Sequence, residues 1–325
     1  IQKRVKAEFI KAILDRNCIE LQIRNTEIDG CVKLNKTSKL AYLSLFCCNL
    51  DARKNFYHEI LNSCCSLKSL TMSGMKHSSN IVLQNLCKKN EKTLFSLDLA
   101  YCRRWISKNS LQVISKHCTE LKQIYLTSTN ISQDAMDTFV SALSPNVETV
   151  CLASNGETMT DGQIEILVSR CNKITTLNIG PGRMGFCDIS QLSNNAITSI
   201  LNHLKNLTEL DITGCPNIEL EKVLELESLP QLKVLNYGLQ HGLGWLNGPY
   251  ENDEMPGLME KLPHLIINKK VDNKIISVGG GIAKVMEHQE DEPGTFTRFE
   301  GSILFACFVI ICYIPYHILL YSGGS

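Results

Sequence analysis

The sequence predicts an α/β solenoid, a horseshoe of stacked repeats with parallel strands on its concave face and helices on its convex face. Three observations support this prediction: a recurring apolar phrase, a nearly constant period, and a helix-like stretch between successive phrases. The phrase is most complete at residues 40–50, which read Leu-x-x-Leu-x-Leu-x-x-Cys-x-Leu. Its fourth residue recurs at spacings of 27, 27, 27, 26, 27, 33 and 25 residues.

Alternate side chains in each phrase are apolar, as expected of a short strand with one buried face. No single repeat can bury its own apolar side, so neighbouring repeats must stack into one core. A period of roughly 20–29 residues with this apolar spacing is the signature of leucine-rich repeats. The fourth positions are Leu43, Leu70, Leu97, Ile124, Val150, Leu177, Leu210 and Leu235.

The rest of each period is long enough for a helix on the convex side. Apolar residues there recur at three- and four-residue spacing, as in Leu111, Ile114 and Cys118. Ser107, Ser132 and Thr160 precede such stretches and are good helix caps. We expect helices over residues 51–64, 80–88, 108–118, 133–143, 160–171 and 194–204.

The ends of the array are less regular. Leu21-x-Ile23 reads as a degraded first repeat, and a phrase at residues 262–267 reads as the last strand. The predicted organisation is therefore a helix or cap at 1–17, containing a helical stretch at 5–14, and a solenoid of about nine to ten repeats at 18–268. Two insertions, at 180–193 and 239–255, interrupt the rhythm. Long irregular insertions are either functional or simply tolerated surface loops.

The composition restricts the partners. Thirty-three basic and thirty-three acidic residues give a formal net charge of zero, which argues against nucleic acid. Fifteen cysteines are an odd number, and several fall at equivalent repeat positions: Cys64, Cys118 and Cys171 before the strand, and Cys48, Cys102 and Cys215 after it. Free cysteine behaves as a small apolar residue when buried, so we expect reduced core thiols; disulfides or a metal site are the alternative.

The pattern Cys-x-x-Leu-x-x-Leu-x-Leu, which starts at Cys118, resembles the cysteine-containing class of leucine-rich repeats. That class is typical of F-box and leucine-rich-repeat proteins, which are cytosolic or nuclear substrate receptors of cullin–RING ubiquitin ligases. The resemblance covers roughly residues 18–268. In that family an F-box precedes the repeats; it is not recognisable in this sequence, and residues 1–17 are too short to supply one. Relatives without an F-box act as adaptors or inhibitors.

The C-terminal part changes in composition. Residues 269–301 contain Gly279-Gly280-Gly281 and an acidic run, which predict a linker. Residues 302–321 carry no acid or base except His317, and twenty such residues are about long enough to cross a bilayer. One interpretation is a C-terminal membrane anchor with the repeats in the cytosol. The alternatives are an artefactual terminus or an apolar segment docked on the solenoid.

No arrangement of residues predicts an active site. Residues 180–185 read Gly-x-Gly-x-x-Gly after a strand, but a dinucleotide site would need a helix to begin there. No Cys-x-x-Cys pair occurs, so zinc is a weak interpretation. We therefore expect no enzyme, no cofactor and no metal. Asp98 and Asp211 fall at equivalent concave positions and are interpreted as solvated strand residues rather than an acid–base pair.

The concave face is the candidate binding surface, because alternation fixes which strand residues point outward. Aromatic side chains in such a groove are candidate anchors. A basic aromatic edge follows at Arg103, Arg104 and Trp105, although Trp105 could instead pack against the next repeat. The candidate protein-binding residues are Phe46, Asp98, Tyr101, Arg104, Trp105, Tyr125, Asn178, Arg183, Glu209 and Asp211.

The favoured interpretation is a monomeric protein-binding solenoid, the substrate-recognition part of an F-box-type ubiquitin ligase receptor in the cytoplasm or nucleus. It would bind a protein on its concave face, and a cullin–RING adaptor if an F-box lies upstream. The alternative is a leucine-rich-repeat adaptor or scaffold without a ligase role, tethered to a membrane through residues 302–321.

Overall fold

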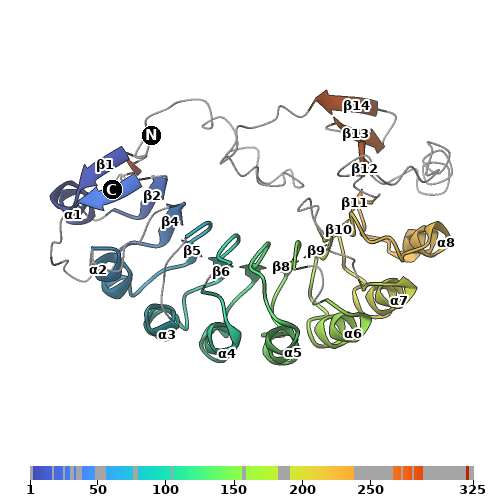
Figure 1. The fold of residues 1–325 in the computed structure, drawn as a ribbon, viewed down its shortest axis with the longest axis horizontal. Helices are drawn as coiled ribbons and strands as arrows, with labels where there is room; N and C mark the ends of the chain where they lie inside the picture. The colour runs from blue at the N-terminus through green and yellow to red at the C-terminus, as the bar shows by residue number, and fades with distance from the viewer. Residues whose placement is uncertain are drawn as a thin grey trace.

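The computed structural model is a curved array with strands along the inner side of an arc and helices along the outer side (Figure 1). It describes residues 3–237 except 17, 25, 30–32, 34–38, 48–55, 76–79, 104, 156–158 and 182–190, together with 266–271, 274–279, 282–287 and 320–321. The predicted leucine-rich-repeat architecture is confirmed.

Short strands and longer helices alternate along the repeats. The repeat strands are β4 (Tyr42–Phe46), β5 (Ser69–Thr71), β6 (Ser96–Asp98), β7 (Gln123–Tyr125), β8 (Thr149–Cys151), β9 (Thr176–Asn178), β10 (Glu209–Asp211) and β11 (Val234–Asn236). The convex helices are α2 (Phe56–Ser63), α3 (Asn80–Lys89), α4 (Lys108–His117), α5 (Gln133–Ala142), α6 (Asp161–Arg170), α7 (Asn194–His203) and α8 (Leu220–Leu224), the last followed by the 3-10 helix η2 (Glu225–Ser228).

The strand register aligns the repeats as the sequence phrase predicts. The fourth residue of each phrase pairs with the fourth residue of the next, as Leu43 does with Leu70 and Leu177 with Leu210. Each of the eight fourth-position side chains is at most 2% exposed. Because all these strands are parallel and face the helices on one side, a single apolar core runs along the arc.

Two of the three predicted helix caps form as expected. The Ser107 hydroxyl accepts from the Ser110 amide, and the Thr160 hydroxyl accepts from the Gln163 amide, each in a reciprocal capping box. Ser132 occupies the cap position of α5, but its side chain accepts no capping bond. Asp134, an acid in the first turn of α5, supplies favourable charge at that end of the helix.

The N-terminal end departs from the prediction. The stretch expected to be helical from residue 5 begins instead with β1 (Lys3–Lys6), and α1 (Ala7–Leu14) follows. The degraded first repeat is confirmed, since β2 (Glu20–Arg24) pairs parallel with β4. β3 (Thr26–Asp29) was not expected; it pairs parallel with β1 in a separate two-stranded sheet.

At the C-terminal end, β12 (Ile266–Val271) continues the parallel ladder, with Ile267 beside Leu235. The prediction of a linker over 269–301 is wrong for its first part, because β13 (Lys274–Gly279) and β14 (Ile282–Glu287) extend the sheet as antiparallel strands. The β-branched run Ile275-Ile276 and the glycines before Ile282 favour this hairpin. β15 (Leu320–Tyr321) pairs antiparallel with β2.

Two predicted features lie outside the described residues: the insertion at 239–255, and residues 302–319 of the apolar segment. Within the part of the chain that the structure describes, no helix is both long and apolar enough to cross a membrane.

Hydrogen bonds to the preceding repeat hold the chain at both ends of the insertion at 180–193. On the strand side, the Gly180 carbonyl accepts from the Ser154 amide at 3.0 Å. On the helix side, Ser193 caps α7, and its backbone amide donates to the Asp161 carboxylate at the start of α6 at 2.9 Å. The start of α7 is therefore held against α6 independently of residues 182–190, which lie outside the described residues.

The cysteines that the structure describes carry free thiols, and seven of them are buried in the core. Cys118 and Cys171 end α4 and α6, as predicted, and are at most 2% exposed. Burial raises the pKa of the Cys171 thiol to about 11. A hydrogen bond with the Cys87 thiol, together with burial, raises the pKa of Cys118 well above its ordinary value.

We expect Cys118 and Cys171 to resist alkylation in the native protein at neutral pH and to react at once in denaturant, because buried protonated thiols are poor nucleophiles. Since folding raises the Cys171 pKa from 9.0 to about 11, its contribution to stability is present below pH 9 and is lost as the pH rises through 11. Mass spectrometry after pulsed alkylation measures both sites, with the partly exposed Cys65 as the internal control. If Cys118 and Cys171 were labelled in the native protein as rapidly as Cys65, their placement at buried helix ends would be contradicted.

Candidate functional site: the concave face

The concave face consists of two rows of side chains that the strand register aligns across eight strands. Residues in the same row are direct neighbours on adjacent strands. The first row is Tyr42, Ser69, Ser96, Gln123, Thr149, Thr176, Glu209 and Val234. The second row is Ser44, Thr71, Asp98, Tyr125, Cys151, Asn178, Asp211 and Asn236. Most of these side chains are short, polar and partly exposed, so a partner could approach close to the strands.

The N-terminal end of the two rows is aromatic. Tyr42 is 38% exposed and is one of the few large apolar side chains so exposed in the described residues. The Arg24 guanidinium lies 5.7 Å from the centre of the Phe46 ring, which is within cation–π range. Tyr125 lies three strands further along, next to Asp98 on β6. Phe46 and Tyr125 are therefore on the predicted face, but some 80 residues and several strands separate them.

Asp98 and Asp211 are not solvated strand residues, contrary to the prediction. Each is 7% exposed. Asp98 Oδ1 accepts from the Ala100 amide at 2.9 Å, and Asp211 Oδ1 accepts from the Thr213 amide at 3.0 Å. Asn178 makes the same bond to the Gly180 amide at 3.3 Å. A side chain that bonds to the backbone two residues ahead stabilises a turn, so these residues shape the end of each strand.

The C-terminal end of the rows carries acids and amides. Asp211 Oδ2 accepts from the Asn178 and Asn236 amide groups at 3.2 and 3.4 Å. Burial raises the pKa of Asp211, against the lowering effect of the hydrogen bonds from Thr213 and Asn236. Burial also raises the pKa of Glu209, which is partly exposed in the first row. These four residues, Asn178, Glu209, Asp211 and Asn236, thus form an acceptor-rich end opposite the aromatic one.

A left-handed turn follows each of several strands at the same repeat position. Its residues are Cys47, Gly74, Tyr101, Ser128, Ser154 and Gly214, with φ between 49° and 84°. The amide of one turn donates to the next repeat, as Tyr101 does to the Thr127 carbonyl at 2.8 Å. Pro181 occupies this position in the repeat with the insertion, and proline cannot adopt positive φ. The insertion therefore begins where the regular turn cannot form.

The basic aromatic edge is only partly available for binding. The Trp105 indole donates to the Met75 carbonyl at 3.0 Å, and its ring packs against the core. Trp105 therefore packs against the preceding repeat, which contains Met75, whereas the alternative considered from the sequence was packing against the next repeat. Arg103 is exposed, and its Nε donates to the Ser128 carbonyl at 3.4 Å. Arg104 and Arg183 lie outside the described residues.

Sequence reasoning missed several residues of this face, among them Arg24 and Asn236. Arg24 lies beside Phe46 because β2 pairs with β4, and Asn236 lies beside Asp211 because β10 pairs with β11. Both residues point away from the core, Arg24 in the degraded first repeat and Asn236 in a weak repeat of the array. The alternation rule applied to residues 20–24 and 234–236 would have found them.

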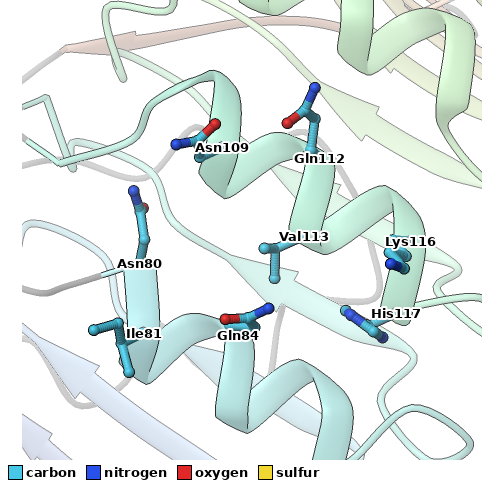
Figure 2. Close-up of a pocket in the computed structure, with 8 residues that line it drawn as sticks. All are labelled: Asn80, Ile81, Gln84, Asn109, Gln112, Val113, Lys116 and His117. Carbon is cyan, nitrogen blue, oxygen red and sulfur yellow. The ribbon is translucent and has the colours of Figure 1, made fainter.

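A separate cavity of about 350 Å³ lies on the convex side, between α3 and α4 (Figure 2). Its floor includes Val113, and Ile81 at its rim is 68% exposed. The other lining residues are Asn80, Gln84, Asn109, Gln112, Lys116 and His117. Among the residues that the structure describes, no group of three or more His, Cys, Asp or Glu side chains is placed to hold a metal ion.

Comparison with known families agrees with this geometry. The family model described as the SKP2 LRR domain matches residues 8–279, which is most of the chain. The chain belongs to the SKP2 LRR domain family. This membership confirms the predicted resemblance to the repeat region of F-box proteins. Leucine-rich-repeat domains are generally interaction modules without catalytic function, so the family supports a protein-interaction domain.

Two solved structures are similar to this SKP2-type domain, and the first of them shares its fold. A chain of the Rad7 and Elc1 complex from yeast is similar, with a TM-score of 0.56 and 17% identity over 77% of this chain and 64% of that chain. The leucine-rich-repeat protein LegL7 from Legionella pneumophila has a TM-score of 0.45 and 16% identity over 82% of this chain and 91% of its own. The present chain thus spans less than two-thirds of the yeast chain that it matches.

Proposed function

We propose that this SKP2-type domain is the substrate-recognition part of an F-box-type ubiquitin ligase receptor, and that it binds its protein substrate on the concave face. The observation that carries the proposal is the pair of registered rows, whose short polar side chains lie between an aromatic end and an acceptor-rich end. A protein partner needs a few large anchors surrounded by groups that complete its hydrogen bonds, and the rows offer both.

The ligase role is supported by family membership and by the cysteine-type repeat. In this proposal a segment upstream of the repeats binds a cullin–RING adaptor, and the protein acts in the cytoplasm or nucleus. The test is affinity purification of the full-length protein from cells, followed by blotting for cullin and adaptor subunits. Recovery of both supports the ligase role. Their absence from a preparation that retains other partners would limit the function to that of a scaffold.

The concave location is tested by placing a long cationic side chain in the middle of the first row. Thr149→Arg should abolish most partner capture, because Arg would project from β8 into the space that the partner occupies. We expect binding at least about tenfold weaker, since blocking a central interface position costs more than about 1.4 kcal/mol. Proximity labelling in cells, quantified by mass spectrometry, measures the partners lost.

The matched control is Ile166→Arg, which adds the same charge to α6 on the convex side, where Ile166 is 42% exposed. Both changes are at the surface, so stability should move by no more than about 0.5 kcal/mol. Equal partner profiles for the two variants would place the binding surface elsewhere.

A further inference from the structure

Tyr101 lies in a left-handed turn, and the equivalent position in the neighbouring repeats is occupied by small residues. At the same turn position, Gly74 and Gly214 have no side chain, and Ser128 and Ser154 have short ones. Tyr101 has φ of 61°, in the left-handed region that is unfavourable for bulky residues. Such strain persists only where the surrounding structure imposes it, and it gathers at binding sites.

Core packing does not account for this tyrosine. Among the described residues, the partly buried apolar side chains that pack against the core include Trp105 and Tyr237, but Tyr101 is not one of them. Its phenol is nevertheless half-buried near the rim of the concave face: burial raises its pKa, the Asp98 charge raises it further and the Arg103 charge lowers it. Asp98 ends β6 three residues before Tyr101, and Arg103 follows two residues after it.

The charge that a partner would meet beside Tyr101 is positive. The Asp98 carboxylate is buried and accepts from the Ala100 amide. Arg103, in contrast, is exposed. A segment complementary to this rim would place an apolar or aromatic side chain on the Tyr101 ring and a carboxylate near the Arg103 guanidinium.

We propose that Tyr101 is the anchor residue of the concave face and that it binds an extended, acidic segment of the partner protein. This inference rests on the proposed function and specifies the chemistry of the partner. A tyrosine is kept in this left-handed turn at the expense of stability because it presents its ring at the rim, where Gly or Ser would leave no anchor.

The probe is a displayed library of random short peptides, selected on the immobilised full chain and then titrated individually by fluorescence anisotropy. We expect the selected peptides to be rich in Asp and Glu. Tyr101→Ala and Tyr101→Gly should both bind them at least about tenfold more weakly, as expected for loss of an aromatic anchor. Arg103→Ala should weaken the binding of the acidic peptides in particular.

Melting temperatures distinguish a binding role of Tyr101 from a purely structural role. Because Gly adopts positive φ freely and Ala does not, Tyr101→Gly should melt at a higher temperature than Tyr101→Ala, while both fail to bind. The matched pair Ser154→Ala and Ser154→Gly, at the same turn position two repeats further on, should show the same order of melting temperatures with unchanged binding.

Each contrary result has a distinct meaning. Peptides that lose binding with Thr149→Arg but retain it with Tyr101→Gly would overturn the anchor and leave the proposed function standing. Peptides insensitive to both changes, or no enriched peptides at all, would overturn both proposals. Equal melting temperatures for Tyr101→Ala and Tyr101→Gly would show that a side chain is not strained in this turn and would overturn the stability cost assigned to the tyrosine.

Discussion

Gly180→Ala should destabilise the protein by about 2–3 kcal/mol, as expected when a well-packed site is overfilled and the backbone cannot move. A Cβ at this position would lie 2.6 Å from the Thr213 carbonyl oxygen and 3.1 Å from both the Thr213 amide and Asp211 Oδ1. Relief by a backbone shift is prevented from both sides, because Gly180 donates to Asn178 and accepts from Ser154.

Gly162→Ala is the matched control. Gly162 lies in the first turn of α6, and the nearest atom to its added Cβ is Thr160 Oγ1 at 4.0 Å. The same substitution should therefore stabilise the protein, by up to about 1 kcal/mol, through helix propensity. Urea unfolding followed by circular dichroism measures both. Similar small changes for the two variants would show that the β9–β10 end of the concave face is not closely packed.

Asn155→Leu should cost about 3–4 kcal/mol, because it leaves several buried backbone groups without partners. The Asn155 side chain, 5% exposed, donates to the Leu126 and Leu152 carbonyls at 2.7 and 3.0 Å. Its oxygen accepts from the Thr129 and Ile131 amides at 3.2 and 3.4 Å. Leucine keeps the approximate size of the side chain but none of these bonds.

The damage should concentrate in the two repeats that Asn155 connects, since solenoid stability is roughly a sum of repeat and neighbour terms. Hydrogen exchange should show faster opening of the Thr129 and Ile131 amides than of amides in β4 or β10. Asn172→Leu, at an exposed position before β9, is the control and should change stability by no more than about 0.5 kcal/mol. Comparable losses for the two variants would mean that the asparagine bridge contributes little.

Periodic features were predictable from the sequence because each one recurs. The period alone placed α3 and α4 within about one residue and identified Cys118 and Cys171 as buried helix ends. Cys102 and Asn155 occupy the same position of their repeats, five residues after the fourth residue of the phrase, and their side chains play the same part in the structure. The Cys102 thiol donates to the Met72 carbonyl at 3.0 Å, as Asn155 does to Leu126.

Features that occur once were not predictable in this way. The two aspartates Asp98 and Asp211 were expected in solvent because alternation gives the direction of a side chain but not the turn that bonds to it. The strand β1 and the hairpin β13–β14 lie where the repeat phrase is absent, so nothing in the period indicates them. Tyr101 was predicted as a binding residue because it is aromatic. Its backbone strain could not be predicted, because it depends on the left-handed turn that six repeats share in the structure.

The hydrogen bonds that join Ser193 to Asp161 and Gly180 to Ser154 have a consequence for how the chain can evolve. Both ends of the irregular stretch are held by neighbouring repeats, so its length does not set the phase of the array. The entropic cost of closing a connection between two fixed ends rises slowly with its length, by about 0.6 kcal/mol for each doubling. Residues can thus be gained or lost between these two points while every later repeat keeps its place, which makes this edge of the arc the place where related sequences can diversify at low cost.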